Sequence, residues 1–428
     1  MHAICVLGKI LAMATAVAVV SPAMSRAQSC DEGLAPSYFK PLTDGDGLRY
    51  PITIGPLSWR LMGDAIQPVK GSDGLTHLAY TLLFTNSWTH PATLKSIEIV
   101  DPMMGDAVTG KNQVLTLKNE DVTGQFRVLS RPATLDKTNF AAEVPPGHSA
   151  VMYFDVTYAK GVHVPSAIAH RAVVSAPGND DKPMEFTVTS APLRLNCEAV
   201  MVLSPPFNGD GWVNGNGCCK EIGPHRFVMN SINGALRPTE EFAIDWIRVD
   251  AQGRLFHGDP KDVKNWYGYG ADVLAVGAGT VVEVMRDLPD EPPGASPTNL
   301  TMGHVGGNRV IIDMGNGRYA EYEHLVPNSP TVHVGDYVRQ GEKIGLLGNT
   351  GNTDAPHLHF QIMDRPSSLD GSALPFVFDR MRLEGRIPLD LQELEDVMKK
   401  AEPVPIDKKD AMGLTRAMPL SRDVLAFE

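Results

Sequence analysis

The sequence predicts a mainly β protein in which an N-terminal immunoglobulin-like β-sandwich precedes a second domain built on an antiparallel β-sheet. The chain contains 40 Gly and 33 Pro, and this high content of turn-forming residues favours many short strands over long helices. Apolar residues also alternate with other residues at a period of two, for example in 76–88 and 148–158. A chain of 428 residues has room for two domains of ordinary size.

The composition limits the functional classes. Hydrophobic residues make up 43% and charged residues 21% of the chain, which is typical of a globular protein. The net charge is −12, and an acidic surface repels a phosphate backbone. We therefore do not expect nucleic-acid binding as a main role.

Residues 1–27 have the pattern of a secretory signal peptide. The run from Ile10 to Val20 is apolar except for Thr15, and small residues, Ser25 and Ala27, precede the expected cleavage before Gln28. The run is too short for a permanent membrane span, and no later segment is apolar enough to cross a bilayer. The sequence therefore predicts a secreted or periplasmic protein without a membrane span.

Four cysteines remain after removal of the signal peptide: Cys30, Cys197, Cys218 and Cys219. An even number in an oxidising compartment permits two disulfides. Because Cys218 and Cys219 are adjacent, we expect them to pair with different partners.

The predicted β-sandwich covers residues 28–200. Within it, Leu78, Tyr80, Leu82 and Phe84 share one face of a predicted strand, and Gly- or Pro-rich turns separate the strands. The histidines of this region are scattered, and we interpret them as surface or strand-end residues. Nothing in this domain indicates chemistry.

The second domain is expected over residues 221–380, after a Gly-, Pro- and Asn-rich linker at 201–220. Asn316-Gly317 between two apolar segments predicts a β-hairpin, and residues 285–307 predict a long irregular insertion. Leu391, Leu394 and Met398 predict a short amphipathic helix within 381–428, followed by a loosely structured tail from Pro403.

Three short segments contain the candidate functional residues. In Pro356–Phe360 a strand would place His357 and His359 on one face, with Leu358 and Phe360 towards a core. Two imidazoles on one face suit a zinc site. Asp245 would point away from the apolar face of residues 242–246, and His324 lies on the segment after the predicted hairpin turn.

The sequence around these residues resembles the M23 (LytM/lysostaphin-like) zinc metallopeptidases. FAIDW (242–246) and YGYGADVLAVGAGTVVEV (267–284) are similar to the first half of that domain, and residues 307–360 are similar to its core. The resemblance implies an M23-type antiparallel β-sheet peptidase domain. It also implies an exported enzyme that cuts peptide cross-links of peptidoglycan.

The resemblance further implies roles for single residues. Asp245 and His359 match the zinc ligands of the family, and His324 and His357 match its two catalytic histidines. Zn²⁺ held by protein ligands makes water nucleophilic at neutral pH, and the two histidines would transfer protons or stabilise the oxyanion.

One position departs from the family pattern. The family has a zinc histidine four residues before the aspartate, where this chain has Glu241. Four residues of straight strand cover about 13 Å, so Glu241 and Asp245 reach one ion only if the chain bends. His225 and His304 are the other candidates for the third ligand, and His225 is preferred.

Two functions stay open at this point. The first is an exported zinc endopeptidase that acts on cell-wall peptides. The second is a catalytically inactive M23-like module that binds the cell wall or activates a partner amidase. The Glu241 substitution favours the second function, whereas the retained His324, His357 and His359 favour the first.

Overall fold

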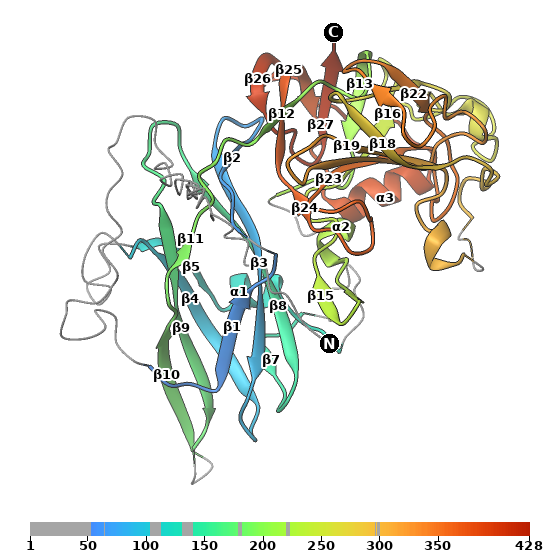
Figure 1. The fold of residues 1–428 in the computed structure, drawn as a ribbon. Coiled ribbons are helices and arrows are strands. Elements are labelled where there is room, and N and C mark those ends of the chain that lie inside the picture. Colours follow the sequence, from blue (N-terminus) through green and yellow to red (C-terminus); the bar gives the residue numbers. More distant parts are fainter. Residues whose placement is uncertain are drawn as a thin grey trace, which may run out of the picture.

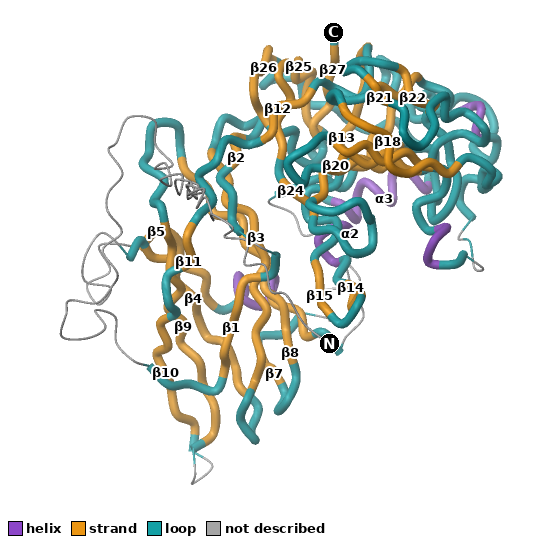
Figure 2. Tube along the Cα trace, viewed as in Figure 1, coloured by secondary structure: helices purple, strands orange, loops and turns teal. Residues whose placement is uncertain are grey.

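The computed structural model describes residues 53–428 except 64, 103–112, 131–139, 179–181, 220–222, 296 and 298–299. Figure 1 shows two lobes, the first formed by the N-terminal strands and the second by the rest of the described chain. Strands dominate both lobes, as Figure 2 shows, so the predicted mainly β class is confirmed. The predicted signal peptide and Cys30 lie outside the described residues.

The first lobe consists of two antiparallel sheets packed around one hydrophobic core. One sheet contains β1 (Leu57–Leu61), β2 (Val69–Lys70), β3 (Thr76–Asn86), β6 (Phe126–Val128) and β8 (Ser149–Tyr158). The other contains β4 (Ala92–Val100), β5 (Gln113–Lys118), β7 (Glu143–Val144), β9 (Ala167–Pro177), β10 (Pro183–Thr189) and β11 (Leu193–Arg194), and α1 (Glu120–Gln125) leads into β6. The immunoglobulin-like relationship of this lobe stays a prediction.

The second lobe is built on one large sheet. Along its main path lie β12 (Met201–Leu203), β25 (Phe376–Arg386), β27 (Asp423–Phe427), β13 (Gly209–Asn214), β16 (Ile244–Arg248), β23 (Leu358–Met363), β20 (Tyr319–Glu323), β19 (Arg309–Asp313), β18 (Gly279–Met285) and β21 (Tyr337–Val338). β24 (Ala373–Leu374) pairs with β23, and β26 (Met412–Ala417) pairs with β25. The β12–β25 pair is parallel, whereas the pairs that surround the candidate site are antiparallel.

Smaller elements surround this sheet. They are α2 (Pro224–Phe227), the β14 (Asn230–Ile232) and β15 (Ala235–Arg237) hairpin, η2 (Val263–Asn265), the β17 (Asp272–Leu274) and β22 (Lys343–Leu346) pair, η3 (Met302–His304) and α3 (Leu391–Lys399). No helix among the described residues is long and apolar enough to cross a membrane.

Alternation explains why the central strands present polar groups on one face only. In β23, Leu358, Phe360 and Ile362 are fully buried in the hydrophobic core. The residues between them, His359 and Gln361, therefore project from the opposite face of the sheet. β16 and β20 repeat this pattern, so the three neighbouring strands together form a polar surface over an apolar core.

The predicted hairpin turn is confirmed between β19 and β20. Asn316 and Gly317 both have positive φ angles, of 53° and 65°. Asn and Gly accept this left-handed conformation at little cost, which is why the pair predicts such turns.

Three local predictions are wrong. The expected linker 201–220 contributes β12 and β13, and the expected loose tail contributes β26 and β27 to the same sheet. These strands are short, and distant partners in the chain pair with them, so local periodicity does not reveal them. Cys218 and Cys219 form a disulfide with each other rather than with different partners. The predicted helix, by contrast, is confirmed as α3, which begins with a capping box at Asp390.

The two lobes share a hydrophobic cluster. Val69 and Ala79 of the first lobe pack with the Cys218–Cys219 disulfide, Phe242 and residues of the large sheet. Figure 1 shows α2 between the two lobes, and Phe227 of α2 packs against Tyr153 of β8. The segment that precedes β16 therefore lies at the interface between the lobes.

Candidate metal centre

The candidate centre contains His225, Asp245 and His359, whose ligand atoms all lie within 4.8 Å of one another. Asp245 on β16 and His359 on β23 are direct cross-strand partners. His225 comes from α2, outside the sheet. Two neighbouring strands and one short helix therefore bring the three side chains together.

The Asp245 carboxylate lies at the middle of this group. Its Oδ1 is 3.0 Å from His359 Nδ1 and 3.5 Å from His357 Nε2. Its Oδ2 is 3.1 Å from His225 Nε2 and accepts a 2.6 Å hydrogen bond from Asn216 Nδ2. One carboxylate thus faces three imidazoles.

Backbone carbonyls fix the orientation of the other imidazole nitrogens. His225 Nδ1 is 3.1 Å from the Ala243 oxygen, His324 Nδ1 is 2.7 Å from the Thr350 oxygen, and His357 Nδ1 is 2.8 Å from the Ala355 oxygen. A carbonyl only accepts, so each Nδ1 is the protonated nitrogen. Each Nε2 is then left as the atom available to a metal, a proton or a substrate.

His324 and His357 lie beside the metal cluster. Their ring centroids are 4.5 Å apart, and the His324 ring is 6.2 Å from that of His359. His324 follows β20 and has a positive φ of 63°, which is uncommon for a residue with a side chain. Such strained backbone is concentrated at functional sites.

The protein environment shifts the pKa of several groups. Burial would raise the pKa of Asp245, but the charges of His225 and His357 hold it well below its usual range. Burial lowers the pKa of His324 well below its usual value, and the neighbouring His357 and His359 lower it further. The site therefore combines an ionised carboxylate with a neutral histidine.

A cavity of about 500 Å³ opens onto this group. Its lining includes all five predicted site residues, namely His225, Asp245, His324, His357 and His359. Ala295, Pro297, Met302 and Val305 of the predicted insertion also line it. The insertion therefore forms one wall of the cavity.

The two other candidates for the third ligand lie elsewhere. The Glu241 Oε1 atom accepts hydrogen bonds from Thr81 and Arg226, at 2.9 and 3.2 Å, and so faces the first lobe. His304 lies in η3 and belongs neither to the cavity lining nor to the donor cluster found among the described residues. Of the three candidates, His225 alone is brought to Asp245 and His359.

Two further residues of the site were not predicted. Asn216 hydrogen-bonds Asp245, and Glu323, directly opposite His359 in the sheet, lines the cavity. Burial raises the pKa of Glu323 well above its usual value, and the Glu321 charge raises it further. No sequence pattern pointed to Asn216, whereas the position of Glu323 beside His324 was a usable signal.

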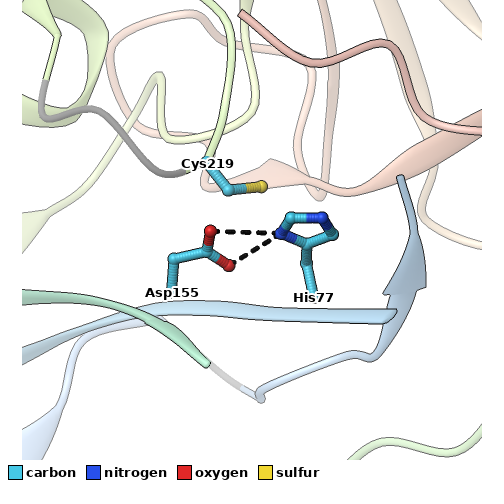
Figure 3. Close-up of side chains that lie close together, drawn as sticks. All are labelled: His77, Asp155 and Cys219. Carbon is cyan, nitrogen blue, oxygen red and sulfur yellow. Dashed lines mark hydrogen bonds and ion pairs between the residues drawn. The ribbon is translucent and has the colours of Figure 1, made fainter. Parts of the chain in front are cut away.

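A second group of potential ligands, His77, Asp155 and Cys219, lies at the lobe interface (Figure 3). The sulfur of Cys219 is already bonded to that of Cys218, so Cys219 does not offer a thiolate. His77 Nδ1 lies 2.9 Å from Asp155, and Nε2 lies 3.2 Å from Asp73. Both nitrogens are thus engaged by carboxylates, which favours a protonated histidine over a metal ligand.

Residues 265–371 match the model of peptidase family M23. The resemblance noted in the sequence is thereby confirmed for this segment. The segment contains His324, His357 and His359, whereas His225 and Asp245 precede it.

Among curated proteins, lysostaphin of Staphylococcus simulans is 32% identical over 126 residues, which are 29% of this chain and 24% of that protein. The peptidoglycan DD-endopeptidase ShyA of Vibrio cholerae is 40% identical over 67 residues, which are 15% of each protein. The matches thus span no more than about a quarter of the length of these two relatives.

Two solved structures are similar as well. The catalytic domain of lysostaphin from Staphylococcus simulans has 23% identity and a TM-score of 0.22, and the match covers 38% of this chain and 88% of that chain. A zinc-containing peptidase from Vibrio cholerae has 17% identity and a TM-score of 0.22, with 74% and 86% covered.

Proposed function

We propose that this protein is an exported zinc endopeptidase that hydrolyses peptide cross-links of peptidoglycan. The observation that carries the proposal is the convergence of His225, Asp245 and His359 in one cavity with His324 and His357. The M23 match over residues 265–371 supports the peptidase class. The relatives named for peptidoglycan cleavage support the substrate class.

The donor set fits zinc. Two imidazole nitrogens and one carboxylate oxygen, with space for a fourth ligand, are typical of catalytic zinc sites. His225 Nε2 and His359 Nδ1 both face the Asp245 carboxylate, at 3.1 and 3.0 Å. The Ala243 carbonyl holds the other nitrogen of His225 and so fixes the tautomer that a metal ligand needs.

Zn²⁺ in this position would supply a Lewis acid that makes water nucleophilic near neutral pH. His324 is neutral, and its Nε2 is available, so it can accept the proton that the attacking water loses. His357 holds its Nε2 near Asp245 and, when protonated, can donate a hydrogen bond to the oxyanion that develops on the substrate carbonyl.

Metal analysis and a cleavage assay test this proposal together. The purified mature protein should contain about one zinc per chain and release peptide fragments from purified peptidoglycan, as measured by mass spectrometry. Less than about 0.1 zinc per chain after zinc loading, together with no cleavage, would contradict it and favour the inactive module that binds the wall or activates an amidase.

Zinc binding without cleavage would separate the two parts of the proposal. In that case the proposed metal centre would be supported, and the assignment of peptidoglycan as the substrate would be refuted. Peptides with different cross-links would then identify the bond that is cut.

A further inference from the structure

The third proposed ligand is held by contacts that cross the interface between the lobes. α2 has four residues, and an isolated helix of that length is not stable in water. Its position must therefore come from tertiary contacts. Of its last three residues, His225 faces the metal cluster, whereas Arg226 and Phe227 face the first lobe.

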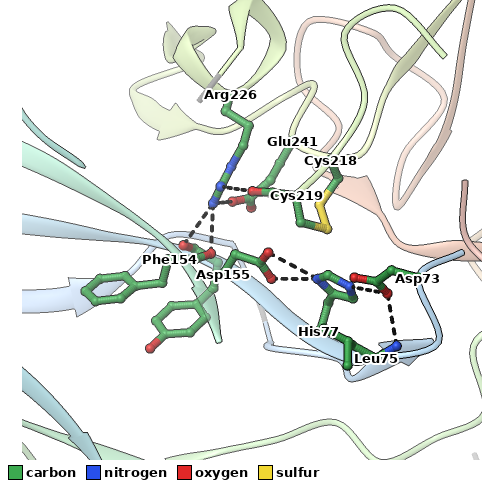
Figure 4. Close-up of polar contacts among 10 residues, drawn as sticks. Asp73, Leu75, His77, Phe154, Asp155, Cys218, Cys219, Arg226 and Glu241 are labelled. Carbon is green, nitrogen blue, oxygen red and sulfur yellow. Dashed lines mark hydrogen bonds and ion pairs between the residues drawn. A yellow bond between two sulfur atoms is a disulfide. The ribbon is translucent and has the colours of Figure 1, made fainter. Parts of the chain in front are cut away.

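Arg226 connects the lobes most directly (Figure 4). Its Nη2 atom donates to the Tyr80 and Phe154 carbonyls of the first lobe, at 3.3 and 3.0 Å. The same atom lies 3.2 Å from Glu241 Oε1, and Nη1 donates to the Cys219 carbonyl at 2.8 Å. Arg226 is 4% exposed, so one buried guanidinium joins α2 to strands β3 and β8.

Phe227 adds a second attachment. Its ring lies 6.1 Å from that of Tyr153 and packs in a cluster with Val151, both on β8. Its carbonyl accepts a 3.3 Å hydrogen bond from Arg127 of the first lobe. The residue after Arg226 is thus also held by the first lobe.

Glu241 takes part in the same interface. It occupies the position where the resemblance predicts a zinc histidine, yet its carboxylate accepts hydrogen bonds from Thr81 of β3 and from Arg226. The chain therefore uses this position to attach the first lobe, and the metal ligand comes from the helix that the first lobe holds.

We propose that docking of the N-terminal lobe through Arg226 and Glu241 positions His225, so that this lobe completes the zinc site. Arg226 is then a positioning residue that acts through His225. The inference rests on the proposed function, because it assigns a means of assembling the metal centre. By thermodynamic reciprocity, zinc binding also stabilises the docked arrangement of the two lobes.

The first test is the zinc dissociation constant of full-length Arg226→Lys, measured by competition with a chelator. Lysine keeps the positive charge but lacks the planar guanidinium group, which contacts the two first-lobe carbonyls and Glu241 at the same time. We expect affinity to fall by about 10- to 100-fold, the range for groups that orient metal ligands. The visible absorption of the cobalt(II)-loaded variant should also change, because the ligand geometry changes.

The matched control is Arg171→Lys, which alters an arginine–glutamate pair within the first lobe. Arg171 pairs with Glu98, and neither contacts α2 in the described structure. Zinc affinity and the cobalt spectrum should be unchanged. Wild-type affinity and spectrum in folded Arg226→Lys would overturn the inference.

The second test uses the wild-type chain and does not depend on a folded variant. Zinc should slow hydrogen exchange of the wild-type chain in β3 and β8 around Tyr80 and Phe154. No zinc-dependent change there would overturn the inference. Absence of zinc binding by the wild type would instead refute the proposed function, so the two failures are distinguishable.

Discussion

The proposed metal ligands are held in two different ways. Asp245 and His359 stand on paired strands inside a large sheet, and the core beneath them fixes their direction. His225 stands on a four-residue helix whose next two residues attach to the other lobe. Two of the proposed ligands therefore belong to the large sheet itself, whereas the third depends on a contact between the lobes.

The largest expected effect is that of removing Asp245, the proposed ligand that lies between His225 and His359. Asp245→Ala should abolish zinc binding and peptidoglycan cleavage, because the carboxylate faces both His225 and His359. Zinc content and fragment release measure this outcome. Asp354→Ala changes an exposed carboxylate in the lining of the same cavity and should keep both properties. Equal losses in the two variants would contradict the assignment.

Removing a histidine that does not bind zinc should separate catalysis from metal binding. His324→Ala should lower kcat by about 10²- to 10⁴-fold, as for loss of a general base, while the zinc content stays unchanged. Steady-state kinetics and metal analysis measure the two quantities. A proportional loss of zinc would show that His324 belongs to the ligand set instead.

The third prediction concerns the helix-borne ligand. His225→Ala should weaken zinc binding by more than about 100-fold, beyond the effect of orienting groups, whereas His304→Ala should leave it unchanged. Chelator competition measures both constants. Adding Glu241→His to His225→Ala should not restore affinity, because residue 241 faces Thr81 and Arg226. A restored affinity would mean that the family's usual ligand position still reaches the metal.

The last prediction concerns the pH dependence of stability at the lobe interface. Burial would lower the pKa of His77, but hydrogen bonds to Asp155 and Asp73 raise it to about 9. The resulting stabilisation, on the order of 3 kcal/mol, is present below about pH 6.5 and is lost as pH rises through about 9. Urea unfolding of wild type and His77→Gln should differ most at low pH and converge above pH 9. A difference independent of pH would refute this.

Sequence reasoning predicted the parts of the fold that depend on local pattern. The alternation in β23 and in β16 placed His359 and Asp245 on the polar face, and the Asn316-Gly317 turn placed the strand before His324. It missed β13 and β27, because each strand is short and the two pair with each other across more than 200 residues of the chain. It also expected a surface or strand-end position for His170, which is fully buried within β9.

The sequence by itself determined the mainly β class, since period-two alternation and turn residues are local properties of the chain, and its resemblance to the M23 peptidases implied Asp245, His324, His357 and His359 as site residues. Tertiary structure alone decided among His225, Glu241 and His304, because that choice depends on which side chain reaches Asp245. The physical reason is that α2 is too short to fix its own position, so Arg226, Phe227 and the first lobe set the direction of His225.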